Sequence, residues 1–185
     1  MSASITQGRP VGESRSQYTQ VTLPNDANNL GNVLGGHIMH LVDMCGGLAA
    51  WRHARGPVVT ASVDQMNFLI PVRVGEVLIL RSSVNRVFHS SMEVGVKVWV
   101  EDRNVRKIRH ASSAYLTFVA VDQDGKPVAV EPAIPETDED KRRYEQAAVR
   151  RERRLLERQN VRNEATVSDC ENTTTSLCDS NIRIL

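Results

Sequence analysis

The sequence has no excess of charge of one sign and no long apolar run. Its 185 residues include 23 Lys and Arg against 22 Asp and Glu, and a net charge of +1 gives no electrostatic reason to expect nucleic acid or an acidic membrane as a partner. The best candidate for a membrane span, residues 38–51, is too short and contains Asp43. Residues 1–15 lack the apolar core of a secretory signal. We therefore expect binding to neither nucleic acid nor membranes.

Cysteine is also scarce. The three residues Cys45, Cys170 and Cys178 make an odd count, which is most simply explained by a reducing compartment. Neither Cys170 nor Cys178 has a histidine nearby or the spacing of metal ligands. We expect a cytoplasmic protein in which these cysteines bind no metal.

The apolar residues follow two periodicities. From Gly36 to about His53 they recur every three or four positions, which predicts one long helix. Elsewhere they alternate, most clearly in 91–102, where every second residue from Met92 to Val100 is apolar. The predicted strands are 18–23, 58–70, 77–88, 91–102 and 111–121. One helix followed by antiparallel strands is an α+β pattern, and the length suits a single domain, here 16–135.

Beyond this domain the pattern changes. Thr137 can cap a helix that has Asp140 at its third position. The segment 136–159 is rich in both signs of charge, which predicts a solvated helix held by pairs of opposite charge rather than a nucleic-acid surface. Residues 160–185 are rich in Ser, Thr and Asn without periodicity, and we expect disorder there, as we do for residues 1–15.

A candidate site lies in the segment 25–47. Asp43 is the carboxylate of a largely apolar helix, and burying it would be costly unless it faces a cleft or a partner. The alternative is that Asp43 lies on a solvated stripe with His40. Two glycines, Gly35 and Gly36, open the helix, where they allow a substrate to approach the backbone.

The same helix start can hold an oxyanion. The first turn of a helix leaves N–H groups free at the positive end of the helix dipole. Here these belong to Gly35, Gly36 and His37, which follow a turn-prone loop of Asn, Asp and Gly. His37 and His40 also lie three residues apart, but two helical histidines without a third ligand do not indicate a metal site.

This segment resembles a known family, the hotdog-fold acyl-CoA thioesterases of the cytosolic broad- and long-chain acyl-CoA hydrolase type. Further similarity lies in 58–78, 89–102 and 118–132, so that the resemblance spans about residues 17–155. It implies a single hotdog domain, in which an antiparallel sheet wraps a long central helix. The residues that match the family pattern are Asp26, Asn28, Gly31, Gly35, Gly36, Ile38, Met39, Val42 and Asp43.

The resemblance also implies a reaction and an assembly. The reaction is hydrolysis of acyl-CoA to fatty acid and CoA, with no metal and no cofactor, since CoA is part of the substrate. Asp43 is the general base or the nucleophile, and Asn28 is its partner across a homodimer interface. Such dimers commonly assemble into hexamers, as trimers of dimers.

Substrate contacts follow from the same resemblance. Thr60 precedes a strand segment that lines the cleft in relatives, and Ser90 and Ser91 lie near the expected pantetheine arm. A basic loop offers Arg106, Lys107 and Arg109 to the CoA phosphates, although such a loop is also ordinary solvated surface.

Two other functions compete with hydrolysis. A hotdog hydratase or dehydratase needs a histidine and a carboxylate, and the sequence NDANNLG lacks the proline and histidine of one such signature. A non-enzymatic acyl-CoA sensor would have lost the carboxylate and gained a DNA-binding segment, whereas this chain keeps Asp43. The chain-length preference cannot be predicted, because pocket depth depends on the assembled dimer.

Overall fold

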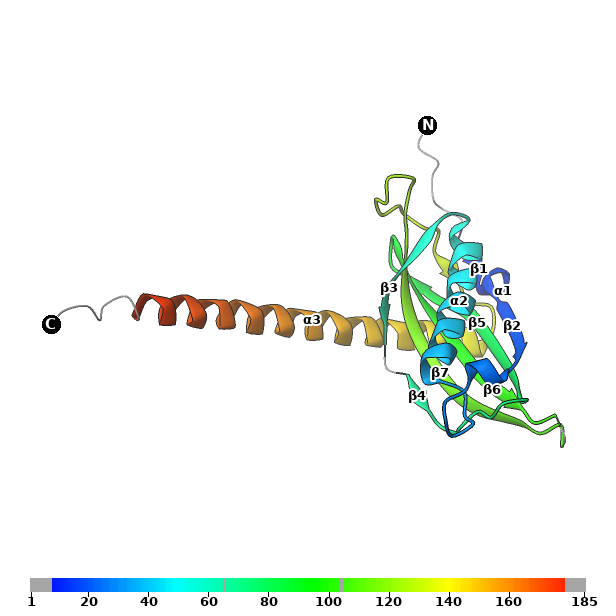
Figure 1. Ribbon diagram of the computed structural model, residues 1–185. Helices are drawn as coiled ribbons and strands as arrows, with labels where there is room; N and C mark the ends of the chain where they lie inside the picture. The colour runs from blue at the N-terminus through cyan, green and yellow to red at the C-terminus, as the bar shows by residue number, and fades with distance from the viewer. Residues whose placement is uncertain (1–7, 65, 104, 179–185) are drawn as a thin grey trace. The chain divides into compact units, whose positions relative to one another are not determined.

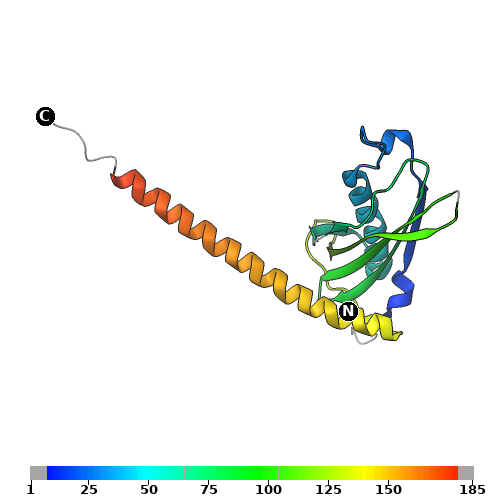
Figure 2. The ribbon, with the colours of Figure 1, turned by 90° about the horizontal axis from the view of Figure 1, so that it is seen from below.

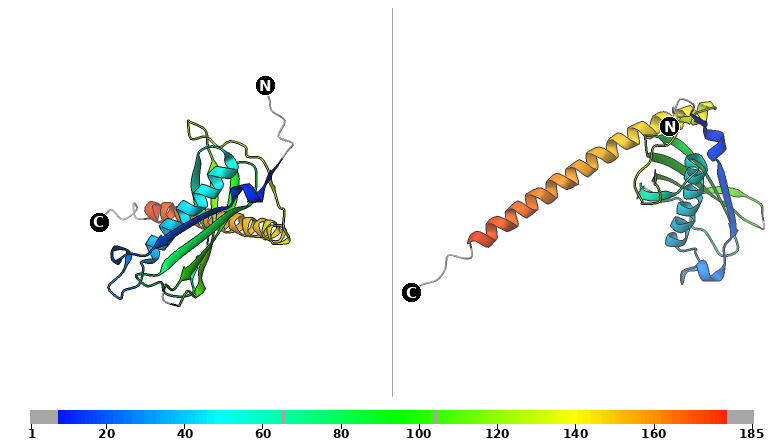
Figure 3. Two further views of the ribbon diagram at one scale, coloured as in Figure 1. Left: turned by 90° about the vertical axis from the view of Figure 1, so that its right-hand side faces the viewer. Right: turned by 90° about the horizontal axis from the view of Figure 1, so that it is seen from above.

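The structure is a computed structural model that describes residues 8–64, 66–103 and 105–178, with side chains as far as residue 160. Its centre is helix α2 (Gly35–Ala54), which lies along one face of an antiparallel sheet (Figures 1, 2 and 3). The strand order is β2-β5-β6-β7-β3, and β4 pairs with β7. These strands are β2 (Ser16–Val21), β3 (Val58–Val63), β4 (Asn67–Phe68), β5 (Val77–Val87), β6 (Ser91–Glu101) and β7 (Ile108–Ala120). The predicted α+β hotdog arrangement is confirmed.

The core lies between α2 and the sheet. Alternate residues of β6, from Met92 to Val100, are at most 1% exposed, which confirms the predicted alternation. They pack with buried residues of α2 such as Leu41 and Val42. Each fully buried side chain of this size contributes about 1.5–3 kcal/mol to folding. No helix among the described residues is both long enough and apolar enough to cross a membrane.

Two strand predictions need correction. The predicted strand 58–70 is two strands, β3 and β4, which pair with successive parts of β7, Val63 with Leu116 and Asn67 with Ser113. A register shift between Thr60 and Ser62 lies within β3. Strand β7 begins at Ile108, three residues before the predicted strand 111–121. Its long hairpin with β6 pairs Ile108 with Glu101, so backbone pairing extends beyond the apolar alternation.

The prediction of disorder over residues 1–15 is wrong for its second half. Strand β1 (Arg9–Pro10) pairs with β8 (Ala133–Ile134), and a short helix, α1 (Val11–Ser14), follows it. Val11 is 2% exposed and belongs to the core. A single buried valine in a polar stretch has no periodicity, which explains why the sequence did not show this order.

Helix α3 (Asp138–Cys178) begins as predicted but ends later. Its capping box is confirmed, because the Thr137 amide donates to Asp140 Oδ2 and the Asp140 amide donates to Thr137 Oγ1, each at 3.1 Å. The expected disorder after residue 160 is contradicted as far as Cys178, since no Gly or Pro interrupts this stretch. Residues 179–185 lie outside the described residues.

By its contacts the chain forms one compact unit that ends at Tyr144 and a second that begins at Glu145.

Asp140 joins the start of α3 to the first unit's N-terminal segment. Its side chain is 3% exposed and accepts hydrogen bonds from Arg15 Nη2 at 3.3 Å and 3.1 Å. Burial alone would raise the pKa of Asp140, but the hydrogen bonds from Thr137 and the charge of Arg15 outweigh burial and lower the pKa. The ionised form is therefore the form that stabilises the fold.

Replacement of Asp140 should destabilise the protein. We expect Asp140→Ala to lower the free energy of unfolding by about 1–3 kcal/mol at neutral pH, because it removes the hydrogen bonds to Thr137 that cap α3 and the ion pair with Arg15. The matched control is Asp138→Ala, whose side chain is fully exposed, at 100%. Denaturant melts of both variants measure the difference, and equal losses would contradict the role of Asp140.

The stability lost in Asp140→Ala should also depend on pH. Because the folded-state pKa of Asp140 is lowered, its contribution is complete above the pKa of the unfolded chain and disappears as the pH falls through the folded-state pKa. The stability gap between wild type and Asp140→Ala should therefore narrow below about pH 4. A gap that stays constant down to pH 2 would contradict this account.

Candidate active site

Asp43 lies in the middle of α2 and faces strand β3. Its side chain is half-buried, and Thr60 Oγ1 donates a hydrogen bond to Asp43 Oδ1 at 2.7 Å. No described residue hydrogen-bonds to Oδ2, the second carboxylate oxygen. One oxygen is thus held in place while the other is free to accept a proton or to attack.

Asn28 lies in the exposed loop before α2. Its side-chain oxygen accepts hydrogen bonds from the backbone amides of Leu30, at 2.9 Å, and Asn32, at 3.2 Å. These two donors fix the orientation of the carboxamide. The Nδ2 group consequently points away from its own loop, and no described residue accepts from it. Asn28 is therefore a preset hydrogen-bond donor.

The helix start provides further donors. The first helical hydrogen bond runs from the Ile38 amide to the Leu34 carbonyl at 3.2 Å, so the amides of Gly35, Gly36 and His37 precede it. A Cβ at Gly36 would meet no atom within 4 Å. The fold of one protomer therefore does not require a glycine here, although glycine weakens a helix by about 0.5–1 kcal/mol relative to alanine. A close approach by a ligand or a second copy would explain it.

The ring of His37 has a different environment. Its Nε2 atom lies 3.7 Å from Asp26 Oδ1 and is buried without a hydrogen bond. The sequence had indicated only the backbone of His37. Among the described residues there is no cluster of three or more His, Cys, Asp or Glu side chains that could hold a metal ion.

The remaining predicted contacts lie elsewhere in the protomer. Ser90 lies in the turn between β5 and β6, and Ser91 is the first residue of β6. The Ser91 carbonyl accepts a hydrogen bond from the Phe88 amide, and the Ser90 carbonyl accepts one from the Ala120 amide. Arg106 and Lys107 are exposed in the β6–β7 hairpin. The third cation, Arg109, is engaged by Glu76.

Glu76 was missed by the sequence analysis. It is 8% exposed, and its Oε1 lies 2.6 Å from Arg109 Nη2 while its Oε2 accepts from the Arg73 amide at 2.8 Å. These residues border a groove of about 730 Å³ that also includes Asp102 and Arg103. The pairing joins positions 33 residues apart, and no local pattern could have shown it.

Residues 30–107 match the Thioesterase superfamily. Over 128 residues the chain is 41% identical to an uncharacterized acyl-CoA thioester hydrolase of Bacillus subtilis, an alignment that covers 69% of this chain and 74% of that relative. The chain belongs to the thioesterase superfamily. This membership agrees with the hotdog resemblance found in the sequence.

Solved thioesterases have the same fold. The acyl-CoA hydrolase of Staphylococcus aureus, solved with butyryl coenzyme A, coenzyme A and coenzyme A disulfide, is 34% identical, with a TM-score of 0.79 over 88% of this chain and 98% of that one. An apo hexameric acyl-CoA thioesterase is 38% identical, with a TM-score of 0.79 over 82% of this chain and 97% of that one. Other solved forms of the S. aureus hydrolase have alanine in place of an aspartate, a threonine or an asparagine.

Proposed function

We propose that this thioesterase-superfamily protein hydrolyses acyl-CoA to a free fatty acid and CoA. The observation that carries the proposal is the Thr60–Asp43 hydrogen bond, which orients a carboxylate on the same helix as the amides of Gly35, Gly36 and His37, about two turns further along. A base or nucleophile and an oxyanion site are the two elements that acyl transfer requires. Solved variants of the S. aureus hydrolase have alanine in place of an aspartate, a threonine or an asparagine, the residue types of Asp43, Thr60 and Asn28.

The reaction follows from these groups. In a dimer that brings the helix start of one subunit to Asp43 of the other, the helix-start amides stabilise the negative charge on the carbonyl oxygen. Asp43 Oδ2 takes a proton from water as the water oxygen bonds to the carbonyl carbon. Collapse of the tetrahedral intermediate breaks the C–S bond and releases CoA thiolate, which takes up the proton. Alternatively, Oδ2 attacks directly and water hydrolyses the resulting anhydride. Both routes use the same free oxygen.

Asn28 supplies the second polar contact. Because its carboxamide oxygen is held by two backbone amides, its Nδ2 is available to the attacking water or the thioester carbonyl. We assign it to the site formed with Asp43 of the other subunit of a homodimer. The three amides, Asp43 and Asn28 need neither metal nor cofactor for this chemistry.

The surface beside Asp43 supports such a dimer. Met44, Leu48 and Trp51 form one stripe along α2 at helical spacing and are between 38% and 53% exposed. Next to it, β3 is an edge strand of the sheet, with Val59 49% exposed. An apolar edge of this kind is normally covered, and pairing with a second copy would cover it. Assembly of these dimers into a hexamer agrees with the hexameric relative.

We assign the substrate's outer part to the remaining residues. Ser90 and Ser91 would contact the pantetheine arm, and Arg106 and Lys107 are free to meet the CoA phosphates. Arg109 would contribute less charge, because Glu76 neutralises it. A cytoplasmic location, where acyl-CoA is present, fits this function.

Loss of the Asp43 carboxylate should abolish most turnover. We expect Asp43→Asn to lower kcat for acyl-CoA hydrolysis on the order of a hundredfold or more while leaving the fold intact. The matched control is Asp124→Asn in the exposed turn after β7, which should keep wild-type rates. Hydrolysis assays across C2 to C18 acyl-CoAs measure both variants. A kcat within threefold of wild type for Asp43→Asn would remove Asp43 from the mechanism.

Thr60 should act by positioning Asp43. Thr60→Val keeps the shape of the side chain but removes the hydroxyl donor, so we expect kcat to fall by roughly tenfold or more, as for the loss of a hydrogen bond to a charged group. Thr60→Ser keeps the donor and should retain most of the activity. If Thr60→Val and Thr60→Ser lower kcat equally, the hydrogen bond to Asp43 does not explain the contribution of Thr60 to activity.

Mixing of variants tests the shared site. Asn28→Ala and Asp43→Asn proteins are each expected to be inactive, and after subunit exchange a 1:1 mixture should regain up to about a quarter of wild-type activity. Half of the dimers are then mixed, and each mixed dimer has one intact site of two. The control is the same mixture before exchange. No recovery after demonstrated exchange would place the site within one subunit.

A further inference from the structure

Glu76 is a buried carboxylate that the proposed reaction does not use. It is 8% exposed and ends the turn 73–76, directly before β5. Its Oε2 accepts a hydrogen bond from the Arg73 amide at 2.8 Å, and its Oε1 lies 2.6 Å from Arg109 Nη2 of β7. Thr22 Oγ1 holds the other side of the turn by donating to the Arg73 carbonyl at 2.7 Å. Glu76 thus ties the amide side of the turn to strand β7.

The same turn holds the loop before α2. Asn32 and Arg73 form an isolated antiparallel bridge, and beside it the Val33 amide donates to the Val72 carbonyl at 2.8 Å. At the tip of the loop, residues 28–31 are all exposed, so apolar packing does not hold them. A segment with few buried contacts opens easily unless its backbone hydrogen bonds hold it. The loop therefore depends on its pairing with the turn.

Asn32 links this pairing to the side chain of Asn28. The Asn28 amide donates to the Asn32 carbonyl at 2.8 Å, and the Asn32 amide donates to Asn28 Oδ1 at 3.2 Å. Asn32 is thus bonded to Asn28 and bridged to Arg73. A shift of the turn would move Asn32 and, with it, the carboxamide whose Nδ2 we assign to the substrate.

We propose that Glu76 is a positioning residue for Asn28. Its Oε2 fixes the amide of Arg73, the bridge from Arg73 fixes Asn32, and Asn32 fixes the Asn28 carboxamide. A continuous series of hydrogen bonds of this kind can transmit the loss of one contact to another. Glu76 itself touches neither the substrate nor the reacting atoms. The inference rests on the proposed function, because it gives Glu76 a role in the site where Asn28 acts on acyl-CoA.

Two substitutions of equal length isolate the hydrogen bond to the turn. Glu76→Met and Glu76→Gln both lose the charge and the ion pair with Arg109, but only glutamine keeps an oxygen that can accept from the Arg73 amide. We expect Glu76→Met to lower kcat for acyl-CoA hydrolysis by roughly tenfold with little change in KM, because a displaced Asn28 weakens contacts made during the reaction. Glu76→Gln should retain kcat within about threefold of wild type.

Hydrogen exchange of the full chain follows the loop independently of activity. The amides of Asn28 and Val33 are hydrogen-bonded in the wild type. In Glu76→Met they should exchange roughly tenfold faster or more, whereas in Glu76→Gln they should exchange as in the wild type.

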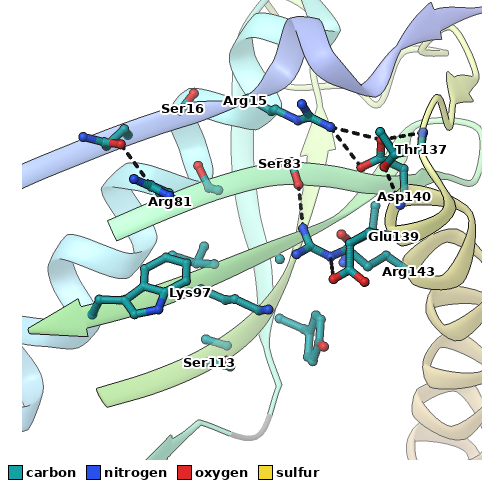
Figure 4. A pocket seen from close by; sticks show the side chains of 18 residues that line it. Arg15, Ser16, Arg81, Ser83, Lys97, Ser113, Thr137, Glu139, Asp140 and Arg143 are labelled. Carbon is teal, nitrogen blue, oxygen red and sulfur yellow. Dashed lines mark hydrogen bonds and ion pairs between the residues drawn. The ribbon is translucent and has the colours of Figure 1, made fainter. Parts of the chain in front are cut away.

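Asp140→Ala is the control for a general loss of stability. Asp140 is bonded to Arg15 and Thr137 at the start of α3, away from the loop that carries Asn28 (Figure 4). Its replacement should destabilise the protein and yet change neither kcat nor the exchange of the loop amides. Equal effects of Asp140→Ala and Glu76→Met on kcat would reduce Glu76 to a structural role.

The outcomes separate this inference from the proposed function. With an active wild type, unchanged kcat or unchanged loop exchange in a folded Glu76→Met would overturn the inference, and so would equal losses in Glu76→Met and Glu76→Gln. A wild type that does not hydrolyse acyl-CoA would refute the proposed function instead. If Glu76→Met does not fold, the wild type still decides: the Arg73 amide should be protected from exchange and should open together with that of Val33. An unprotected Arg73 amide would show that Glu76 does not hold the turn.

Discussion

The close approach of helix α2 to the sheet is the constraint on which the rest of the structure depends. Gly46 sits where a Cβ would lie 3.2 Å from the Phe118 ring and 3.4 Å from a Val96 methyl group. The helix backbone therefore rests almost directly on sheet side chains. This contact fixes the height and rotation of α2, and so it fixes where Asp43, three residues earlier, emerges beside Thr60. A larger residue at position 46 would displace the site as well as the core.

Helix α2 is apolar on two sides for two different reasons. One side, which includes Leu41, Val42 and Ala49, is buried within the protomer. The stripe of Met44, Leu48 and Trp51 is exposed, although exposed apolar surface of this kind usually marks an interface. Asp43 lies between the two sides. A carboxylate there avoids full burial within the protomer.

The sheet separates two chemically distinct regions. Its inner face packs on α2 and is almost wholly apolar, as the alternating valines of β6 show. Its outer face carries Lys97, Gly95 and the buried pair Asn85–Glu93, which the start of α3 covers only in part. The period of two along each strand makes this separation possible, because neighbouring residues point to opposite faces.

The sequence by itself determined the elements whose signals are local. The helical spacing of α2, the alternation of β6, the Thr137–Asp140 capping box and the glycine-rich helix start all follow from interactions between residues a few positions apart. The same local signals failed at the chain's ends, because one buried valine at position 11 leaves no pattern and a helix can extend beyond 160 where nothing breaks it.

Only the tertiary structure decided which distant side chains meet. Strand register and the position of α2 on the sheet bring together the Thr60–Asp43 and Glu76–Arg109 pairs. They also leave the buried Asn85 Oδ1 without a hydrogen-bond donor. Register is set by the packing of whole faces, so a shift of one residue would turn the strand side chains Thr60, Arg109 and Asn85 to the other face. The candidate acid and amide groups could thus be named from the sequence, while their geometry required the folded chain.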